Sequence, residues 1–196
     1  MQTRFLIITG MSGAGKTQVV RTLEDLKYFC IDNLPAALIP KFAELCRQTS
    51  ESNVALVVDV RGGQFFDKLL QVLDEIKASG QKYELLFLDA DDATLVRRYK
   101  ETRRRHPLGD SETLLDNLAQ ERELLAPLLE KSTYIINTTD LNSSELKNRV
   151  RELFSTDNER ERMGIVVRSF GFKYGLPLDS DLVLDVRFLP NPFYVE

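Results

Sequence analysis

The chain has 196 residues, of which 43% are hydrophobic and 29% are charged, a balance typical of folded globular proteins. Its net charge of −4 argues against general nucleic-acid binding by the whole surface, although a local basic patch is compatible with it. The sequence has no apolar run of membrane-spanning length, no signal-peptide pattern, and only two cysteines, Cys30 and Cys46, without metal-ligand spacing. These features predict a cytoplasmic protein that does not contact a membrane.

Apolar stretches of strand length alternate with stretches of helical periodicity along the first 156 residues. In chain order, the predicted strands are 4–9, 28–31, 53–60, 83–88 and 134–136. The predicted helices are one that begins near Lys16, then 36–49, 65–76, 92–105, 113–131 and 143–154. Asn142 and Glu145 have the spacing of a capping box at the start of the last helix. This alternation predicts an α/β fold, a parallel sheet with helices on both faces.

The sequence pattern changes after Thr156. Residues 157–162 (DNERER) are a charged run that indicates a linker or a solvated turn. Beyond it, 164–170 and 181–188 are predicted strands joined by a Gly- and Pro-rich connection, and no helical pattern follows. We therefore expect a first domain over residues 1–156. Residues 157–196 are expected to be a linker and the opening strands of an incomplete second small domain.

The stretch GMSGAGKT matches the P-loop pattern G-x-x-x-x-G-K-[ST] in full and lies between a predicted strand and a predicted helix. It comprises Gly10, Met11, Ser12, Gly13, Ala14, Gly15, Lys16 and Thr17. Glycines let successive backbone N–H groups point at phosphate oxygens, and the helix N-terminus adds its positive dipole end. Lys16 is expected to reach the β- and γ-phosphates, and the Thr17 hydroxyl to ligate Mg²⁺. A dinucleotide-binding loop requires the different spacing G-x-G-x-x-G.

Three aspartates lie at or directly after the ends of predicted strands and are candidates for further roles at such a site. P-loop proteins hold Mg²⁺, usually through water, with an acidic residue at a strand end, and both Asp59 and Asp89 have this placement. We favour Asp59, because the third strand usually neighbours the P-loop strand. Asp32 follows the second strand, where small-molecule kinases often orient their acceptor, and a simple turn residue is an equally good interpretation.

Residues 97–105 (RRYKETRRR) hold six basic groups in nine positions. This block is interpreted as a lid that clamps phosphates, as a phosphate-binding patch for RNA, or as an ordinary solvated helix face. The adjacent His106 is placed in a loop and is assigned no catalytic role. Residues 137–140 (NTTD) are similar to the guanine-reading N-K-x-D, but threonine replaces the lysine, so a cap and turn is the stronger interpretation.

Five stretches together resemble the RapZ/YvcJ family of bacterial P-loop nucleotide-binding proteins, over nearly the whole chain. They are GMSGAGKT, YFCIDNLP, VVDVRG, LLFLDADDATLVRRYKETRRRHPL and SFGFKYGLPLDSDLVLDVRFLPNP. The resemblance implies a kinase-like P-loop domain that binds ATP and GTP and hydrolyses them weakly, with residues 10–17 as the ATP-phosphate site. It also implies a GTP-binding role for Asp59, Val60, Arg61 and Gly62.

In the enterobacterial branch, the family resemblance implies an adaptor that binds a small regulatory RNA and guides its cleavage by an RNase. That RNA contact is associated largely with a C-terminal domain, of which this chain holds only the beginning. We therefore expect a regulatory NTPase that reports a metabolic state to a protein partner, either as a monomer or as a homo-oligomer. A small-molecule kinase and an RNA-binding adaptor stay open as alternatives.

Overall fold

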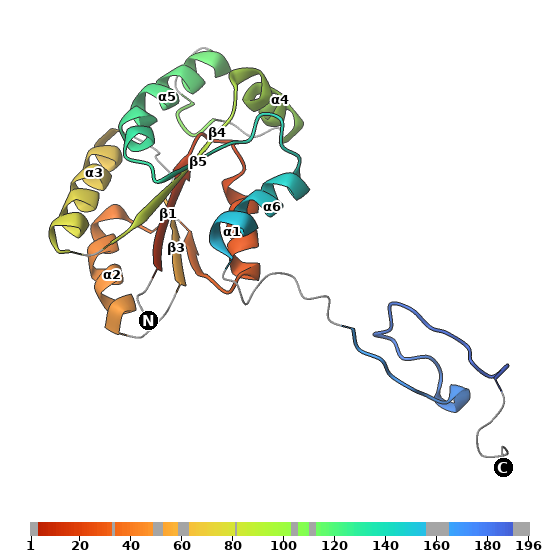
Figure 1. The fold of residues 1–196 in the computed structure, drawn as a ribbon. Coiled ribbons are helices and arrows are strands. Elements are labelled where there is room, and N and C mark those ends of the chain that lie inside the picture. Colours follow the sequence, from red (N-terminus) through yellow and green to blue (C-terminus); the bar gives the residue numbers. More distant parts are fainter. Residues whose placement is uncertain are drawn as a thin grey trace. The chain divides into compact units, whose positions relative to one another are not determined.

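The computed structural model describes residues 4–32, 34–48, 53–58, 63–80, 82–102, 106–109, 113–155 and 165–189. The chain divides into two compact units, Met1–Arg160 and Glu161–Glu196 (Figure 1), which are described separately below.

The first unit is built on a parallel sheet of five strands in the order β2-β3-β1-β4-β5. The strands are β1 (Arg4–Gly10), β2 (Phe29–Asp32), β3 (Asn53–Val57), β4 (Glu84–Asp89) and β5 (Tyr134–Asn137). β1 lies at the centre, where Leu6 is in register with Ala55 of β3 on one side and with Glu84 of β4 on the other. Because all strands run in one direction, their carboxyl ends meet at a single edge of the sheet.

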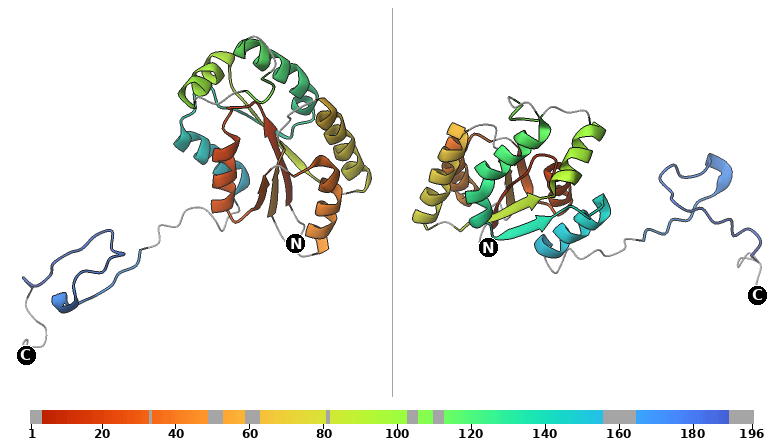
Figure 2. Two further views of the ribbon diagram at one scale, coloured as in Figure 1. Left: turned by 180° about the vertical axis from the view of Figure 1, so that it is seen from behind. Right: turned by 90° about the horizontal axis from the view of Figure 1, so that it is seen from above.

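Six helices of the described residues cover the sheet, five of them between strands and the last after β5. They are α1 (Lys16–Asp25), α2 (Ile39–Gln48), α3 (Gly63–Ala78), α4 (Asp92–Thr102), α5 (Leu114–Glu130) and α6 (Ser143–Phe154), with a 3₁₀ turn, η1 (Ala36–Leu38), before α2. Figures 1 and 2 show α1 and α6 side by side on one face of the sheet and α2 and α3 on the other. The predicted α/β fold, a parallel sheet with helices on both faces, is confirmed.

The core forms where β1 passes through the middle of the sheet. Phe5, Leu6, Ile7 and Ile8 are each at most 1% exposed, so the strand is buried on both of its faces. A parallel central strand needs this continuous apolar run, since helices cover both sides. The rigid strand brings Gly10, its last residue, to the carboxyl edge of the sheet.

The second unit differs from its prediction. Residues 165–189 contain no strand, and the only regular element described there is a 3₁₀ turn, η2 (Phe172–Tyr174), so the predicted strands 164–170 and 181–188 are wrong over these residues. An extended segment becomes a strand only when its backbone groups pair with a neighbour. Within the described residues 165–189, contacts form inside this unit, such as the ion pair between Arg168 and Asp179 at 3.0 Å.

Candidate functional site

The loop after β1 has the curled backbone that its sequence predicts. Gly10, Gly13 and Gly15 have φ angles of 135°, 88° and 103°, a region that residues with a Cβ rarely enter. At Gly10 the requirement is also steric, because a Cβ there would lie 2.1 Å from the Leu88 carbonyl oxygen of β4. The Met11 N–H donates to the same oxygen at 2.9 Å, so the start of the loop is fixed to the neighbouring strand.

The helix α1 begins immediately after this loop. Its N-cap is Gly15 in the left-handed conformation, and no side chain caps the helix there. The first backbone N–H groups of a helix have no intrahelical acceptor, and with the helix dipole they favour an anion. The Lys16 ammonium lies across the loop, donating to the Gly10 carbonyl at 2.8 Å and to the Met11 carbonyl at 3.3 Å. The Thr17 side chain is exposed.

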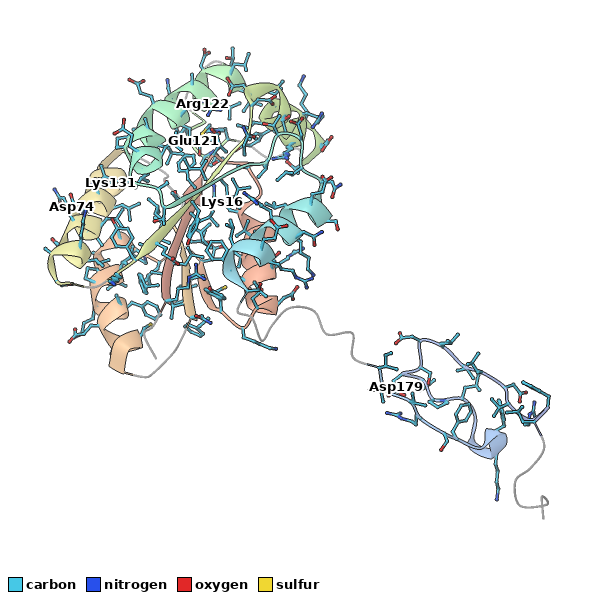
Figure 3. All side chains as sticks on the ribbon, in the orientation of Figure 1. Lys16, Asp74, Glu121, Arg122, Lys131 and Asp179 are labelled. Carbon is cyan, nitrogen blue, oxygen red and sulfur yellow. The ribbon has the colours of Figure 1, made fainter. Side chains whose placement is uncertain are left out.

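A buried carboxylate contacts the loop from α5. Glu121 accepts hydrogen bonds from the Ser12 N–H at 3.1 Å and from the Ser12 hydroxyl at 2.6 Å. His106 lies on its other side, with Nε2 at 3.1 Å from Glu121 Oε2. Figure 3 shows Glu121 and Lys16 toward the same end of the sheet. The two buried side chains therefore join the P-loop, α5 and the segment after α4.

Asp89, the competing Mg²⁺ candidate, is engaged by Arg122 of α5. The Arg122 guanidinium donates to both Asp89 oxygens, at 2.8 and 3.0 Å, and to Asp92 at 2.9 Å. Burial alone would lower the pKa of Arg122, but the hydrogen bonds to Asp92 and Asp89 outweigh it and the pKa rises. β3 and β4 both adjoin β1, so strand order alone does not favour Asp59 over Asp89. Residues 59–62, including the favoured Asp59, lie outside the described residues.

One arginine of the basic block holds the P-loop from α4. Arg98 donates to the Gly13 carbonyl at 3.1 Å, to the Thr138 hydroxyl at 2.9 Å and to the Thr138 carbonyl at 2.7 Å. Burial, followed by the charge of the neighbouring Arg97, lowers the pKa of Arg98. The three donor contacts tie α4, the P-loop and the residues after β5 together. Residues 103–105 of the block lie outside the described residues.

The segment after β5 contacts the loop through Thr138. Its side chain is buried, and its hydroxyl lies 3.0 Å from the Ala14 carbonyl. Asn142 caps α6 a few residues later in a complete capping box with Glu145, as predicted. The NTTD stretch, residues 137–140, forms a turn in which the Thr139 N–H donates to the Asn137 side-chain oxygen at 2.9 Å, whereas the helix cap lies after it, at Asn142. The sequence pattern did not indicate its contact to the P-loop through Thr138.

Asp32 and a surface hollow lie away from these contacts. Asp32 ends β2 at the same carboxyl edge of the sheet, and its side chain is exposed. A separate hollow of about 410 Å³ lies between β5 and α6 and includes no P-loop residue. Within the described part of the chain, no group of three or more His, Cys, Asp or Glu residues forms a metal cluster, and no helix is long and apolar enough to span a membrane.

Sequence reasoning missed Glu121, Thr138 and the partner of His106. For Glu121 a signal was available: it falls between Leu118 and Leu125 at helical spacing, so a charged residue interrupts the buried stripe of α5. No comparable signal marks Thr138 or the pairing of His106 with Glu121, because these contacts depend on how the loops approach one another.

Comparison with known proteins relates both units to one family. The model for the RapZ-like N-terminal domain matches residues 3–158, and the model for the RapZ C-terminal domain matches residues 163–196. A nucleotide-binding protein of Clostridium botulinum (strain Loch Maree / Type A3) is 53% identical over 196 residues, covering 98% of this chain and 67% of the relative. One of Desulforamulus reducens is 55% identical over 195 residues, covering 98% and 65%. The chain thus spans about two thirds of the length of these relatives.

Two solved structures show the fold. Shikimate kinase of Bacteroides thetaiotaomicron has a TM-score of 0.53 at 21% identity, over 76% of this chain and 97% of the other. The tunicamycin resistance protein of Deinococcus radiodurans has a TM-score of 0.52 at 16% identity, over 79% and 98%. At such identities the likeness concerns the fold alone. Together with the family matches, it shows that the chain belongs to the RapZ family and has a kinase-like P-loop fold.

Proposed function

We propose that this protein binds ATP and GTP with Mg²⁺ at residues 10–17 and hydrolyses them slowly, as a regulatory NTPase. The observation that carries the proposal is the loop itself, whose three glycines at positive φ lead into an α1 N-terminus without a side-chain cap. Such a backbone presents N–H groups and a positive dipole end to phosphate. The names of the relatives, nucleotide-binding proteins, support the same proposal.

Lys16 and Thr17 would act on the phosphates and on the metal. The Lys16 ammonium lies 2.8 Å from the Gly10 carbonyl, so it neutralises phosphate charge by exchanging that acceptor for a phosphate oxygen. The exposed Thr17 hydroxyl is an oxygen ligand of the kind that Mg²⁺ prefers, so it fits the predicted metal. Asp59 would hold the metal through water, and Asp59, Val60, Arg61 and Gly62 would contribute to GTP binding, as the family resemblance implies.

The engagement of two carboxylates near the loop supports slow turnover. Hydrolysis requires a group that orients the attacking water. Asp89 is held by the Arg122 guanidinium, and Glu121 is held by Ser12 and His106. Neither of these two carboxylates is available for the water, which supports positioning of the phosphates without an efficient water-activating base.

A small-molecule kinase is the second candidate, and Asp32 is the observation that favours it. Its carboxylate is exposed at the carboxyl end of β2, at the edge of the sheet that also carries the P-loop. An acceptor hydroxyl bound there would meet the γ-phosphate from the side of β2. An RNA-binding role has less support, because Arg98 is already used to hold Gly13 and Thr138.

We also propose how the chain is divided between the nucleotide site and the second domain. The nucleotide site would lie wholly in residues 1–156, and residues 157–196 would be a linker and the opening of the second domain. We propose a cytoplasmic setting, and a protein partner that responds to the bound nucleotide. Self-association into a homo-oligomer is compatible with this role.

Phosphate release from Mg-ATP and Mg-GTP tests the proposal. We expect slow release that Lys16→Ala abolishes and that Arg21→Ala, which removes an exposed cation of α1, preserves. Parallel reactions contain a pool of amino sugars and nucleosides. Release that is indifferent to these acceptors supports the NTPase. Consumption of ATP that requires one acceptor, yields a phosphorylated product and is lost in Asp32→Asn would establish the kinase instead.

A further inference from the structure

Glu121 is a buried carboxylate on a helix side that also carries the buried Asn117. It is 3% exposed and lies on the buried side of α5 between Leu118 and Leu125, which are 0% and 1% exposed. Burying a carboxylate is costly unless its oxygens receive hydrogen bonds. Three donor contacts reach it, from the Ser12 N–H, from the Ser12 hydroxyl and from His106. Among the described residues, the hydrogen bonds that stabilise this carboxylate thus come from the P-loop and from His106.

The orientation of His106 follows from its second ring nitrogen. The Leu108 N–H donates to His106 Nδ1 at 3.2 Å, so Nδ1 is an acceptor and the ring proton lies on Nε2. Nε2–H therefore donates to Glu121. The His106 ring is 7% exposed and lies 5.4 Å, centroid to centroid, from the ring of Tyr99. His106 is accordingly held in one orientation by α4 and by its own loop, and it orients the Glu121 carboxylate.

The contact to Ser12 bears on how the loop can bind phosphate. Ser12 lies between Gly10 and Gly13, two of the residues at positive φ, whose backbones have more conformations available than other residues. Its N–H donates to Glu121, and the Ala14 N–H donates to the Met11 carbonyl at 3.0 Å. The backbone donors that can face phosphate are therefore the N–H groups of Gly13 and of residues 15–17. The start of the loop is tied to Leu88 through Met11, and its middle is tied to α5 through Ser12.

We propose that Glu121 is a positioning residue of the nucleotide site. With His106 it holds Ser12 so that the N–H groups of Gly13 and of residues 15–17 face the phosphates before nucleotide binds. This inference rests on the proposed function, since it concerns the affinity of that site. A site organised in advance binds more tightly, because less conformational entropy is lost on binding.

The first test compares Glu121→Gln with Thr113→Ala. The glutamine keeps an oxygen for Ser12 but places its NH₂ group against a second hydrogen-bond donor of Ser12 or His106. Thr113→Ala removes the N-cap of the same helix, and Thr113 has no hydrogen bond to the P-loop among those of the described residues. Calorimetric titration with Mg-ATP and Mg-GTP should show about tenfold weaker binding for Glu121→Gln, the effect of losing one charge-assisted hydrogen bond. Thr113→Ala should bind nucleotide within about twofold of the wild type, although it should lose about as much thermal stability as Glu121→Gln. Equal weakening in both variants, or none in Glu121→Gln, would overturn the proposal.

His106 supplies a second pair of variants, which also serves if Glu121→Gln does not fold. The Nε2 of a glutamine can take the place of the histidine Nε2–H, so His106→Gln should retain a nucleotide affinity close to that of the wild type. His106→Leu, which has no donor, should weaken nucleotide binding. Identical affinities for the two variants would contradict the proposed role of the His106 donor.

Amide hydrogen exchange in the nucleotide-free protein separates this inference from the proposed function. Residues 11–17 should exchange faster in Glu121→Gln and His106→Leu than in the wild type and in Thr113→Ala. If the wild type binds neither nucleotide, the proposed function fails, and exchange still reports whether Glu121 orders the loop. If nucleotide binds but exchange and affinity are unchanged in Glu121→Gln, only the positioning role fails.

Discussion

Gly10 is the residue at which backbone conformation and packing both exclude any side chain. Its φ is 135°, and a Cβ would lie 2.1 Å from the Leu88 oxygen, which is backbone of a buried strand and has little room to move. We expect Gly10→Ala to lower the free energy of unfolding by ~3 kcal/mol or more. Gly80→Ala is the matched control, because Gly80 also has a positive φ of 77° but nothing within 4 Å, so it should cost only about 1 kcal/mol. Urea unfolding measures both, and equal losses would contradict the steric argument.

The partial burial of Cys30 lowers the reactivity of its thiol. Burial, with a smaller contribution from the charge of Glu24, raises the pKa of the Cys30 thiol from 9.0 to about 12. The difference of three pH units leaves about a thousandfold less thiolate near pH 8, and the thiolate is the reactive form. In a Cys46→Ala background, we expect the folded protein to react with a thiol reagent at pH 8 at least a hundredfold more slowly than the urea-unfolded chain. Similar rates would mean that the thiol ionises in the folded state.

Arg98 joins helix α4 and the segment after β5 to the P-loop. It donates to Gly13 and Thr138 from α4, whereas the adjacent Arg97 is exposed. Arg98→Ala leaves the Gly13 and Thr138 acceptors without this donor, and we expect a loss of about 1–2 kcal/mol in the free energy of unfolding. Arg97→Ala removes the same charge from the same helix and should change it by less than about 0.5 kcal/mol. Urea unfolding of the two variants measures the difference. Equal urea concentrations at their unfolding midpoints would contradict the expected role of Arg98.

The elements of the first unit could be predicted from the sequence because their determinants are local. α6 has the predicted bounds, 143–154, because its capping box is encoded by Asn142 and Glu145. β2 begins one residue later than predicted, at Phe29, since an apolar run alone does not fix its register. The contacts of Glu121 and Arg98 could not be predicted in this way. They join residues 109 and 85 positions apart, and only the folded sheet brings such residues together.

At the scale of the whole molecule, the parallel sheet brings the candidate site together. Four strands end at one edge with a group that the proposals use: β1 with Gly10, β2 with Asp32, β4 with Asp89, and β5 with the residues leading to Thr138. The P-loop motif identified Gly10 from the sequence, and the strand-end positions of Asp32 and Asp89 made them candidates there. The role of Thr138 became visible only in the folded sheet, which brings the carboxyl ends of β1, β4 and β5 to one edge.

The second unit contrasts with the first because its apolar side chains are not covered within the described residues. Val166, Val167 and Leu178 are 83%, 90% and 105% exposed. Two backbone hydrogen bonds within the described residues 165–189 are local turns, from the Gly175 N–H to the Phe172 carbonyl and from the Leu189 N–H to the Val186 carbonyl. Extended segments without sheet partners or a covering helix are not independently stable.

We therefore expect residues 165–188 to exchange their amide hydrogens far faster than β1, whose residues Phe5 to Ile8 form the centre of the sheet. Exchange followed by mass spectrometry on a monomeric sample measures this, and β1 provides the protected reference in the same experiment. Strong protection throughout 165–188 in the monomer would contradict the expectation. Protection that appears only at high protein concentration would indicate that a second copy covers the exposed apolar side chains, and sedimentation at the same concentrations would test that.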